Sequence, residues 1–558
     1  MSWSAFAFAA APYAEASYAL LEDPAFQEFL DDVTAPRCVL LELDVLSLAA
    51  ADAAAGAYAA SAHAVQPFSG AASGAAPGVV TLRFSTHGYR SRLATDSVDA
   101  SAPWWFEPRI LSEPGIDRRI VGRDGIGGLA RTGGELQLIN ADGALDHLSR
   151  DYAVEGRAVR LLMGRPTDPY SAFGELFTGV VESVTTGLDA VTLRLSDGAA
   201  KLNAPMQVSA YAGTGGNEGG ADLAGRPKPV CLGQVRGISP PLVDAANLVY
   251  QVHDGAISAV DAVYDRGVAL DYTAGVPGAG EYSVDLSTGL FTLGAAPDGA
   301  VTADVRGDAG LSGYIDTTGA LVLRALSTRA ALYSSEIDPG SFSALDSEAP
   351  ASVGVWIGAE QRTVGSVVDE LLAGIGAFGG FSRLGAFTVA RVGKPAGADR
   401  AVFTENEIID LAREPLPAPV EPVAWRVAVG WGKNYTPQDD VASGAADAQR
   451  SFAAHAWRIA VEEDASIKSR HLLAVEYGPS ESLYAEQADA ADEALRLFDL
   501  WCTRRSLYRV SLPARALTCD LGQVVRIEHA RHGFAAGRSV RVLGQQIRGE
   551  RVELRVLA

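Results

Sequence analysis

The stretch that decides the fold runs from Gly225 to Tyr272 and reads GRPKPVCLGQVRGISPPLVDAANLVYQVHDGAISAVDAVYDRGVALDY. Four prolines punctuate it: Pro227, Pro229, Pro240 and Pro241. Each proline lacks a backbone N–H donor and pushes the residue before it away from helix. The pattern therefore predicts a connection that ties domains together rather than a segment that carries out chemistry.

A second segment, Glu135–Leu148 (ELQLINADGALDHL), precedes this connection. Together the two segments resemble the hub proteins of tailed bacteriophages. In that family a segment such as GKPKPLAYGRVxNxxPxLV, followed by an apolar stretch ending in VYDRG, lies behind a β-rich first domain. In this chain such a domain would end near Met206. The resemblance covers most of the chain, from about Cys38 to Ala558, and its motifs are structural.

Length and composition indicate a multidomain globular protein. The chain has 558 residues, and typical domain sizes predict roughly three to four domains. Apolar residues make up 48% and charged residues 20%, while 59 glycines and 27 prolines indicate many turns. The predicted fold class is mainly β with some α, with β-barrel or sandwich domains at both ends and small α+β domains between them.

The net charge of −22 argues against a protein that grips nucleic acid through its overall field. The last segment, Pro513–Ala558, differs, because it carries eight arginines against four carboxylates and is net +4. Arginine suits planar, bidentate pairing at interfaces. The chain uses arginine far more often than lysine, and GC-rich codon usage is the alternative explanation for this preference.

The four cysteines indicate neither a disulfide framework nor a zinc site, because they lie far apart without a C-x-x-C spacing: Cys38, Cys231, Cys502 and Cys519. The beginning of the chain does not have the pattern of a secretory signal, and no apolar run approaches the roughly 20 residues of a membrane span. We therefore expect synthesis in the host cytoplasm.

Periodicity divides the chain into five predicted regions, and the resemblance implies that the first and the last β-rich regions are the two barrel domains of a hub. They are an N-terminal arm with one helix (1–34), a β-barrel hub domain with an Ala/Gly-rich loop at 49–78 (35–206), a middle β-rich domain (207–355), a small α+β segment (356–420) and a C-terminal β-barrel domain with a helix at 483–504 (421–558). The clearest strand is AVTLRLS at 190–196, which alternates apolar and polar residues. The segment 363–377 (TVGSVVDELLAGIGA) predicts a helix with an apolar stripe at Val364, Val367, Val368 and Leu371. In the last helix an apolar face is expected at these positions: Ala488, Ala491, Leu495, Phe498 and Trp501.

Glycine-rich segments are the first candidates for a binding site. Gly374, Gly376 and Gly379 spell G-x-G-x-x-G, but here a predicted helix precedes the glycines and a strand follows them. With that order the helix N-terminus cannot face a phosphate, so we interpret the motif as a turn. The loop 213–220 lacks the Lys-Ser/Thr ending of a phosphate loop and is interpreted as a connector.

Candidates for metal binding and catalysis are equally weak. His529 and His532 would need a third ligand, and the nearest, Glu528, points to the opposite face of a strand from His529. The acidic run 462–464 could belong to a glycosidase, but a charge run is usually a solvated face. No nucleophile or zinc-protease motif is present. We predict no catalytic, cofactor-binding or metal-binding residues, and no enzyme activity.

The paired aromatics at 104–106 (Trp-Trp-Phe) are a candidate contact surface. Successive strand residues face opposite sides, so the rings cannot all lie in one core. One ring could cap an interface, and the alternative is that each ring lies under a loop of its own domain.

The resemblance implies a function. It implies a structural hub at the distal end of a phage tail or of a related gene transfer particle, located in the virion at the tail tip. Three copies would form a ring, with the domains 35–206 and 421–558 alternating beneath the tail tube. The implied partners are tail tube and distal tail proteins, the tape measure protein, and tail fibre or receptor-binding proteins. DNA would pass through without specific binding, and the acidic balance suggests a negative lumen.

Two other classes of protein remain open from the sequence. One is a cell-envelope polysaccharide or peptidoglycan hydrolase of the virion, which would need a cleft with a perturbed carboxyl group or a metal. The other is a carbohydrate-binding adhesin, which shares the β-rich composition and would bind glycans as an isolated chain.

Overall fold

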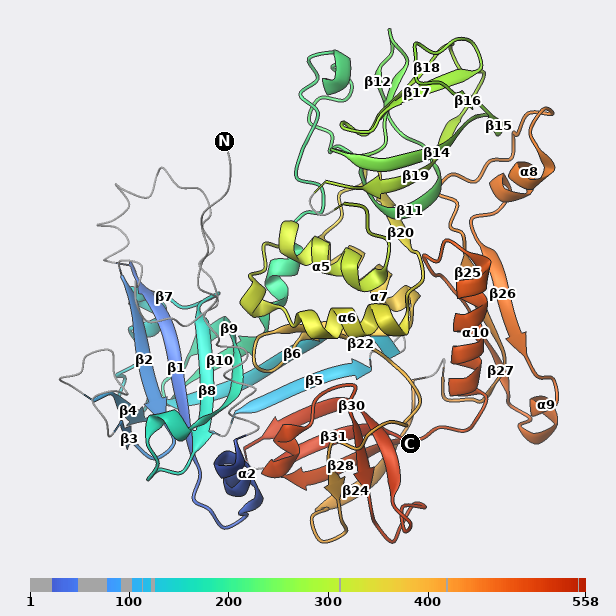
Figure 1. Ribbon diagram of the computed structural model, residues 1–558. Coiled ribbons are helices and arrows are strands. Elements are labelled where there is room, and N and C mark those ends of the chain that lie inside the picture. The colour runs from blue at the N-terminus through green and yellow to red at the C-terminus, as the bar shows by residue number, and fades with distance from the viewer. Residues whose placement is uncertain are drawn as a thin grey trace.

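The computed structural model describes residues 23–48, 78–91, 103–112, 114–121, 126–310, 313–417, 420–549 and 551–558. In these residues the protein is mainly β, as the sequence predicts (Figure 1). Residues 1–22 of the predicted arm lie outside the described residues, and so do residues 49–77 of the predicted loop.

The N-terminal part of the largest sheet follows a short helix. The elements are α2 (Pro24–Asp31), β1 (Cys38–Ser47), β2 (Val79–Ser85), β3 (Tyr89–Arg90), β4 (Trp105–Pro108), β5 (Gly115–Val121), β6 (Ile126–Ile139), α4 (Leu148–Asp151), β7 (Tyr152–Ala153), β8 (Ala158–Gly164), η2 (Tyr170–Ala172), β9 (Gly174–Thr186), β10 (Ala190–Ser196) and η3 (Gly198–Asn203). Helix α2 begins where the Asp23 side chain accepts the Ala25 N–H at 2.7 Å.

This part of the sheet curls but does not close. Strand β1 pairs with β2 on one side and with β8 on the other, and the row continues through β9 and β10 to β6. The two ends meet through the segment 109–111, in which Ile110 bridges to Leu138 and donates its N–H to the Ser85 carbonyl at 3.1 Å, and Leu111 donates its N–H to the Gln137 carbonyl at 2.8 Å. Among the described residues no sheet is a continuous closed barrel.

The C-terminal strands join the same sheet. They are β23 (Val402–Phe403), β24 (Asp410–Glu414), β28 (Leu507–Pro513), β29 (Val524–Ile527), β30 (Arg538–Arg548) and β31 (Arg551–Leu557). The short 3-10 helix η6 (Ala514–Thr518) lies between β28 and β29. Strand β30 pairs antiparallel with β5, with Gln546 opposite Asp117. Strands from the predicted regions 35–206 and 421–558 therefore lie side by side in one sheet.

The connection 225–272 builds the centre of the middle region, as a series of strands rather than an irregular linker. This region contains η4 (Gly216–Glu218), β11 (Val230–Ile238), β12 (Leu242–Asp244), β13 (Val249–Gln251), β14 (Ile257–Asp265), β15 (Val268–Ala269), β16 (Asp271–Tyr272), β17 (Glu281–Asp285), β18 (Leu290–Leu293), β19 (Val301–Asp308) and β20 (Gly354–Ile357). They form two five-stranded sheets, with orders β15-β14-β19-β11-β20 and β12-β13-β18-β17-β16.

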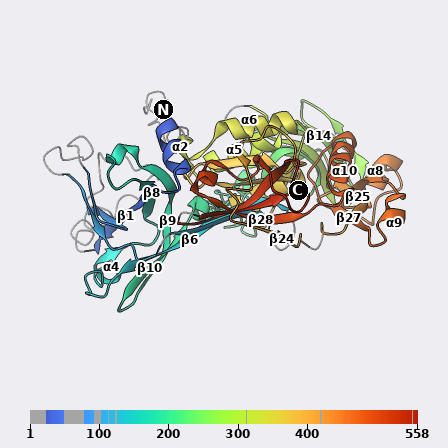
Figure 2. The ribbon, with the colours of Figure 1, turned by 90° about the horizontal axis from the view of Figure 1, so that it is seen from below.

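Helices cover one side of the large sheet (Figure 2). They are α5 (Thr318–Thr328), η5 (Ser334–Glu336), α6 (Pro339–Glu348) and α7 (Val364–Gly374), followed by the hairpin β21 (Ala377–Phe381) and β22 (Phe387–Arg391). The predicted apolar stripe of α7 is buried, including Val364, Val368 and Leu371. On the opposite side, the β9–β10 hairpin and α4 project from the molecule (Figure 2).

The segment 424–501 forms a separate three-stranded sheet. Its elements are β25 (Ala424–Trp431), α8 (Asp447–Ala453), β26 (Arg458–Glu463), α9 (Ile467–Arg470), β27 (Val475–Ser480) and α10 (Gln487–Trp501). The sheet order is β26-β25-β27, and α10 packs on β25 and β26. The predicted region 421–558 is thus distributed over two sheets.

The apolar face predicted for α10 was wrong at most positions. The helix buries Ala490, Ala494, Leu497 and Trp501, whereas Leu495 is 49% exposed. The helix carries apolar residues on two faces, and packing on β25 selects one of them. Periodicity within one helix cannot make that choice.

Candidate assembly surface

A broad polar surface follows the strand row β9-β10-β6-β5-β30-β31-β28-β24, which combines both ends of the chain. Strand alternation puts apolar residues on its other side. The polar sheet face consists of these side chains: Asp117, Arg119, Arg131, Glu135, Gln137, Thr192, Arg194, Asp410, Glu414, Arg509, Gln546, Arg548, Arg551, Glu553 and Arg555.

The opposite side of the row is the core. Thr132, the neighbour of Arg131, is buried and donates its hydroxyl to the Phe381 carbonyl of β21 at 3.2 Å. Val552 and Leu554 of β31 are fully buried. The hairpin β21–β22 and the helices behind it therefore lie on the far side of the sheet from the polar sheet face.

Ion pairs bridge neighbouring strands of the polar sheet face. Arg509 of β28 lies 3.1 Å from Asp410, 3.3 Å from Glu553 and 3.5 Å from Glu414. Arg555 of β31 reaches Glu414 at 3.0 Å. These contacts connect β24, β28 and β31, and they occupy the guanidinium groups with carboxylates of the same chain.

Similar pairing occurs around β5 and β6. Arg119 Nε donates to Asp117 at 2.8 Å, and this hydrogen bond to the Asp117 carboxylate raises the pKa of Arg119. Glu135 lies directly opposite Arg194 across β6 and β10. The polar sheet face has more arginines than carboxylates, although the whole chain is net −22. Its surface is therefore mixed in charge and not acidic.

A buried polar contact holds the two ends of the chain together beneath this face. Arg118 of β5 is 3% exposed, and its Nη1 donates to Asp520 at 2.6 Å and to Gln545 Oε1 at 3.3 Å. Gln545 is fully buried, and its amide donates to the Cys519 carbonyl at 2.9 Å. Replacing one member would leave a buried charge without its partner.

The strand row has unpaired edges at both ends. In the described residues β24 pairs only with β28. Strand β9 pairs with β8 up to Val180, so among the described strands residues 182–186 have only β10 beside them. The β9–β10 turn carries Leu188, which is 91% exposed. Open strand edges and an exposed leucine are features of a surface that another chain covers.

The structure places the predicted glycine motif where a turn was expected. Gly374 ends α7 and Gly379 lies in β21, so the helix precedes the strand. Gly376 has φ +62°, and a Cβ there would lie 2.3 Å from Arg496 Nη2. The loop 213–220 holds the short helix η4 and joins the middle region to η3.

The histidine pair lies in a turn between β29 and β30. His529 Nδ1 accepts the Arg531 N–H at 3.0 Å, and Glu528 is paired with Arg526 at 3.0 Å. Among the described residues, no three His, Cys, Asp or Glu side chains are grouped so that they could hold a metal ion. All four cysteines are free.

The acidic run and the aromatic triplet also have partners. Glu463 pairs with Arg426 at 3.2 Å. Phe106 is fully buried, whereas Trp105 is 57% exposed, which agrees with the expected alternation along a strand. Trp104 lies under the Arg83 guanidinium, 4.3 Å from its ring centroid.

Two arginines of the basic C-terminal segment have different roles. Arg541 is half-buried and binds its own chain, donating to the Gly522 carbonyl at 2.6 Å and to the Lys394 carbonyl at 2.8 Å. Arg551 is exposed and lies opposite Arg548 at the end of the β30–β31 hairpin.

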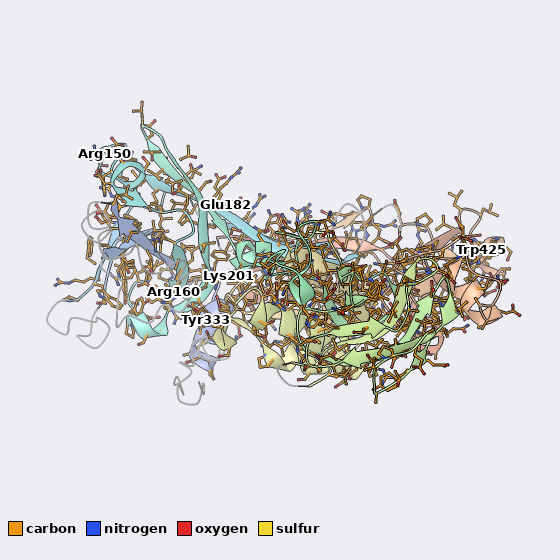
Figure 3. The ribbon with its side chains drawn as sticks, turned by 90° about the horizontal axis from the view of Figure 1, so that it is seen from above. Arg150, Arg160, Glu182, Lys201, Tyr333 and Trp425 are labelled. Atoms are coloured by element: carbon orange, nitrogen blue, oxygen red, sulfur yellow. The ribbon has the colours of Figure 1, made fainter. Side chains whose placement is uncertain are left out.

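Figure 3 shows that Arg150 and Trp425 mark opposite ends of the molecule.

No family model matches the sequence, and neither does any curated protein sequence. Similar solved structures include a tail protein from Neisseria meningitidis MC58 (9% identity, TM-score 0.38, 81% of this chain and 93% of that chain). Others are the 43 kDa tail protein of prophage MuSo2 from Shewanella oneidensis (9%, 0.35, 81% and 93%) and a chain of a native gene transfer agent virion (14%, 0.40, 60% and 84%). TM-scores below 0.5 do not establish a shared function.

Proposed function

We propose that this chain is a structural hub protein at the distal end of a phage-type tail. Three copies form a ring that joins the tail tube to the tail tip and its fibres and surrounds the DNA exit channel. The observation that carries the proposal is the single strand row in which β5 pairs with β6 on one side and with β30 on the other, because it unites both ends of the chain in one surface. The family resemblance of the connection 225–272 supports it.

The polar sheet face lines the channel in this proposal. Some of its arginines are paired with carboxylates across strands, as at Arg509 and Arg555. Paired guanidinium groups offer phosphates little net charge, so DNA passes without specific binding. This differs from the negative lumen expected from composition, because the surplus of acids lies elsewhere on the chain.

The open edges of the strand row are where we place the contacts between copies. Strand β24 of one copy faces the projecting β9–β10 hairpin of the next, so that both edges are covered in the ring. The remaining partners are the tail tube and distal tail proteins, the tape measure protein, and fibre or receptor-binding proteins. The chain is located in the virion, at the tail tip. No helix in the described ranges is long and apolar enough to cross a membrane.

Counting copies in purified particles tests the proposal. Isotope-labelled peptides of this chain and of the tube subunit, quantified by mass spectrometry, should give three copies per tail. Six copies, one copy, or absence from the particle would contradict a trimeric hub.

The chain acts as a structural protein without turnover in this proposal. Purified protein should release no soluble product from peptidoglycan or capsule. Turnover that disappears in Glu463→Gln would favour a hydrolase instead.

A further inference from the structure

Helix α10 has a second apolar face that the described chain covers only in part: Ala488, Ala491 and Leu495 are exposed, whereas Phe498 is half-buried and packs partly against the chain's own core. Its buried face packs on β25 and β26, while Figure 1 shows the helix in front of that sheet with its other side open. Leu495, at the middle of the open side, is 49% exposed. A half-exposed leucine at the centre of a helix face costs solvation free energy unless another surface covers it.

The open face has the spacing of a helix-pairing seam. Its residues follow one another at intervals of three, four, three and four: Ala488, Ala491, Leu495, Phe498 and Cys502. These intervals are the a and d positions of a heptad, at which two helices pack side chains into each other. Leu495 and Phe498 supply apolar bulk, while Ala488 and Ala491 allow a close approach at the first turn.

Carboxylates border this seam. Asp492 and Asp499 follow Ala491 and Phe498 and take the flanking e positions, and Asp489 and Glu486 lie at the start of the helix. Burial, together with repulsion from Asp492 and Glu486, raises the pKa of Asp489. The carboxylates therefore repel one another, and a cation placed beside them would relieve that repulsion.

Other cations of the chain neutralise this border only in part. Asp499 lies 2.8 Å from Lys394 and Glu486 lies 2.9 Å from Arg236, but both acids are more than half exposed. Asp492 forms no ion pair within the described ranges. Exposed pairs of this kind contribute little, so negative charge remains beside the seam.

A second copy of this chain does not offer a complementary helix. None of the described helices of eight or more residues carries more than one lysine or arginine. Residues 1–36 contain no lysine or arginine at all. The cationic partner that the border requires must come from a different protein.

We propose that the open face of α10 binds a basic amphipathic helix of another protein, with apolar side chains against Leu495 and Phe498 and lysine or arginine beside Asp492 and Asp499. The spacing sets a helix as the partner, and the acidic border sets its charge. This proposal does not depend on the role of the chain in a tail.

A designed peptide tests it with the full chain. The probe is a labelled peptide of three heptads with leucine at a and d and lysine at e and g, and its partner probe has glutamate at e and g. Fluorescence anisotropy should show binding of the lysine peptide that weakens as salt rises from about 50 to about 200 mM. The glutamate peptide should bind at least tenfold more weakly.

Variants place the binding on α10. Leu495→Gln should weaken binding of the lysine peptide roughly tenfold or more, and Asp492→Asn roughly threefold, with unchanged thermal unfolding. Leu473→Gln is the matched control, because Leu473 is 84% exposed but lies before β27. Equal binding of both peptides, no binding of the lysine peptide, or equal effects of Leu495→Gln and Leu473→Gln would overturn the proposal.

Discussion

Loss of the carboxylate that faces Arg118 should open the junction between the two ends of the chain. The change is Asp520→Asn, which keeps the size of the side chain and removes its charge. Arg118 is 3% exposed and Asp520 is 26% exposed. Removing one partner of a buried pair costs about 3–5 kcal/mol, and the partial exposure of Asp520 reduces this to roughly 2–3 kcal/mol.

Hydrogen exchange measures this cost at the strands concerned. Amides in the β5–β30 ladder exchange through local opening of the pairing between residues 115–121 and 538–548. A loss of about 2–3 kcal/mol corresponds to exchange that is roughly 30- to 150-fold faster. Mass spectrometry of peptides from these two segments reads the change directly, whether or not the whole chain unfolds in one step.

Two controls separate the buried pair from a general effect of charge. Asp151→Asn removes an exposed pair with Arg150 and should leave exchange in the ladder unchanged. Replacing both members, Arg118→Met with Asp520→Leu, removes the buried charge as well and should restore much of the protection. Less than threefold faster exchange in Asp520→Asn would refute the reasoning.

Three further predictions concern other parts of the chain. Burial lowers the pKa of His253 to about 4, below the unfolded value of about 6.5. The contribution of the neutral imidazole to stability should therefore be full above pH 6.5 and be lost as pH falls towards 4. The thermal unfolding midpoint of His253→Asn should decline less than that of the unchanged chain over this range. Gly233→Ala should lower the unfolding midpoint by several degrees more than Gly225→Ala, because both have positive φ but only the first Cβ would meet a backbone oxygen, at 2.0 Å; equal effects would contradict this. Exchanging Arg548 and Arg551 for serine should weaken assembly in a salt-dependent way without unfolding the chain. Normal assembly across a salt titration would contradict a contact between these arginines and a neighbouring subunit.

The sequence predicted local structure well where a pattern is complete within one segment. The alternation of AVTLRLS became β10 with the expected bounds, and the stripe of 363–377 became α7 with its apolar residues buried. The predicted fold class was confirmed. These features depend on periodicity, which a short segment displays by itself.

Long-range pairing was not visible in the sequence. Residues 115–121 gave no distinct strand signal, yet β5 joins β6 to β30 across more than 400 residues of chain. The apolar face that the sequence predicted for α10 became its open face for a similar reason, because both of its faces are apolar and only the position of β25 selects between them. A polar sheet face also has no motif, since its residues come from strands throughout the chain.

Electron cryomicroscopy of the assembled particle tests the central claim most directly. The account predicts three copies at the tail tip, with the polar sheet face toward the axis and with β5 and β30 of each copy side by side in the wall of the channel. A map with six copies, with one copy beside the axis, or with the polar sheet face turned outward would contradict it.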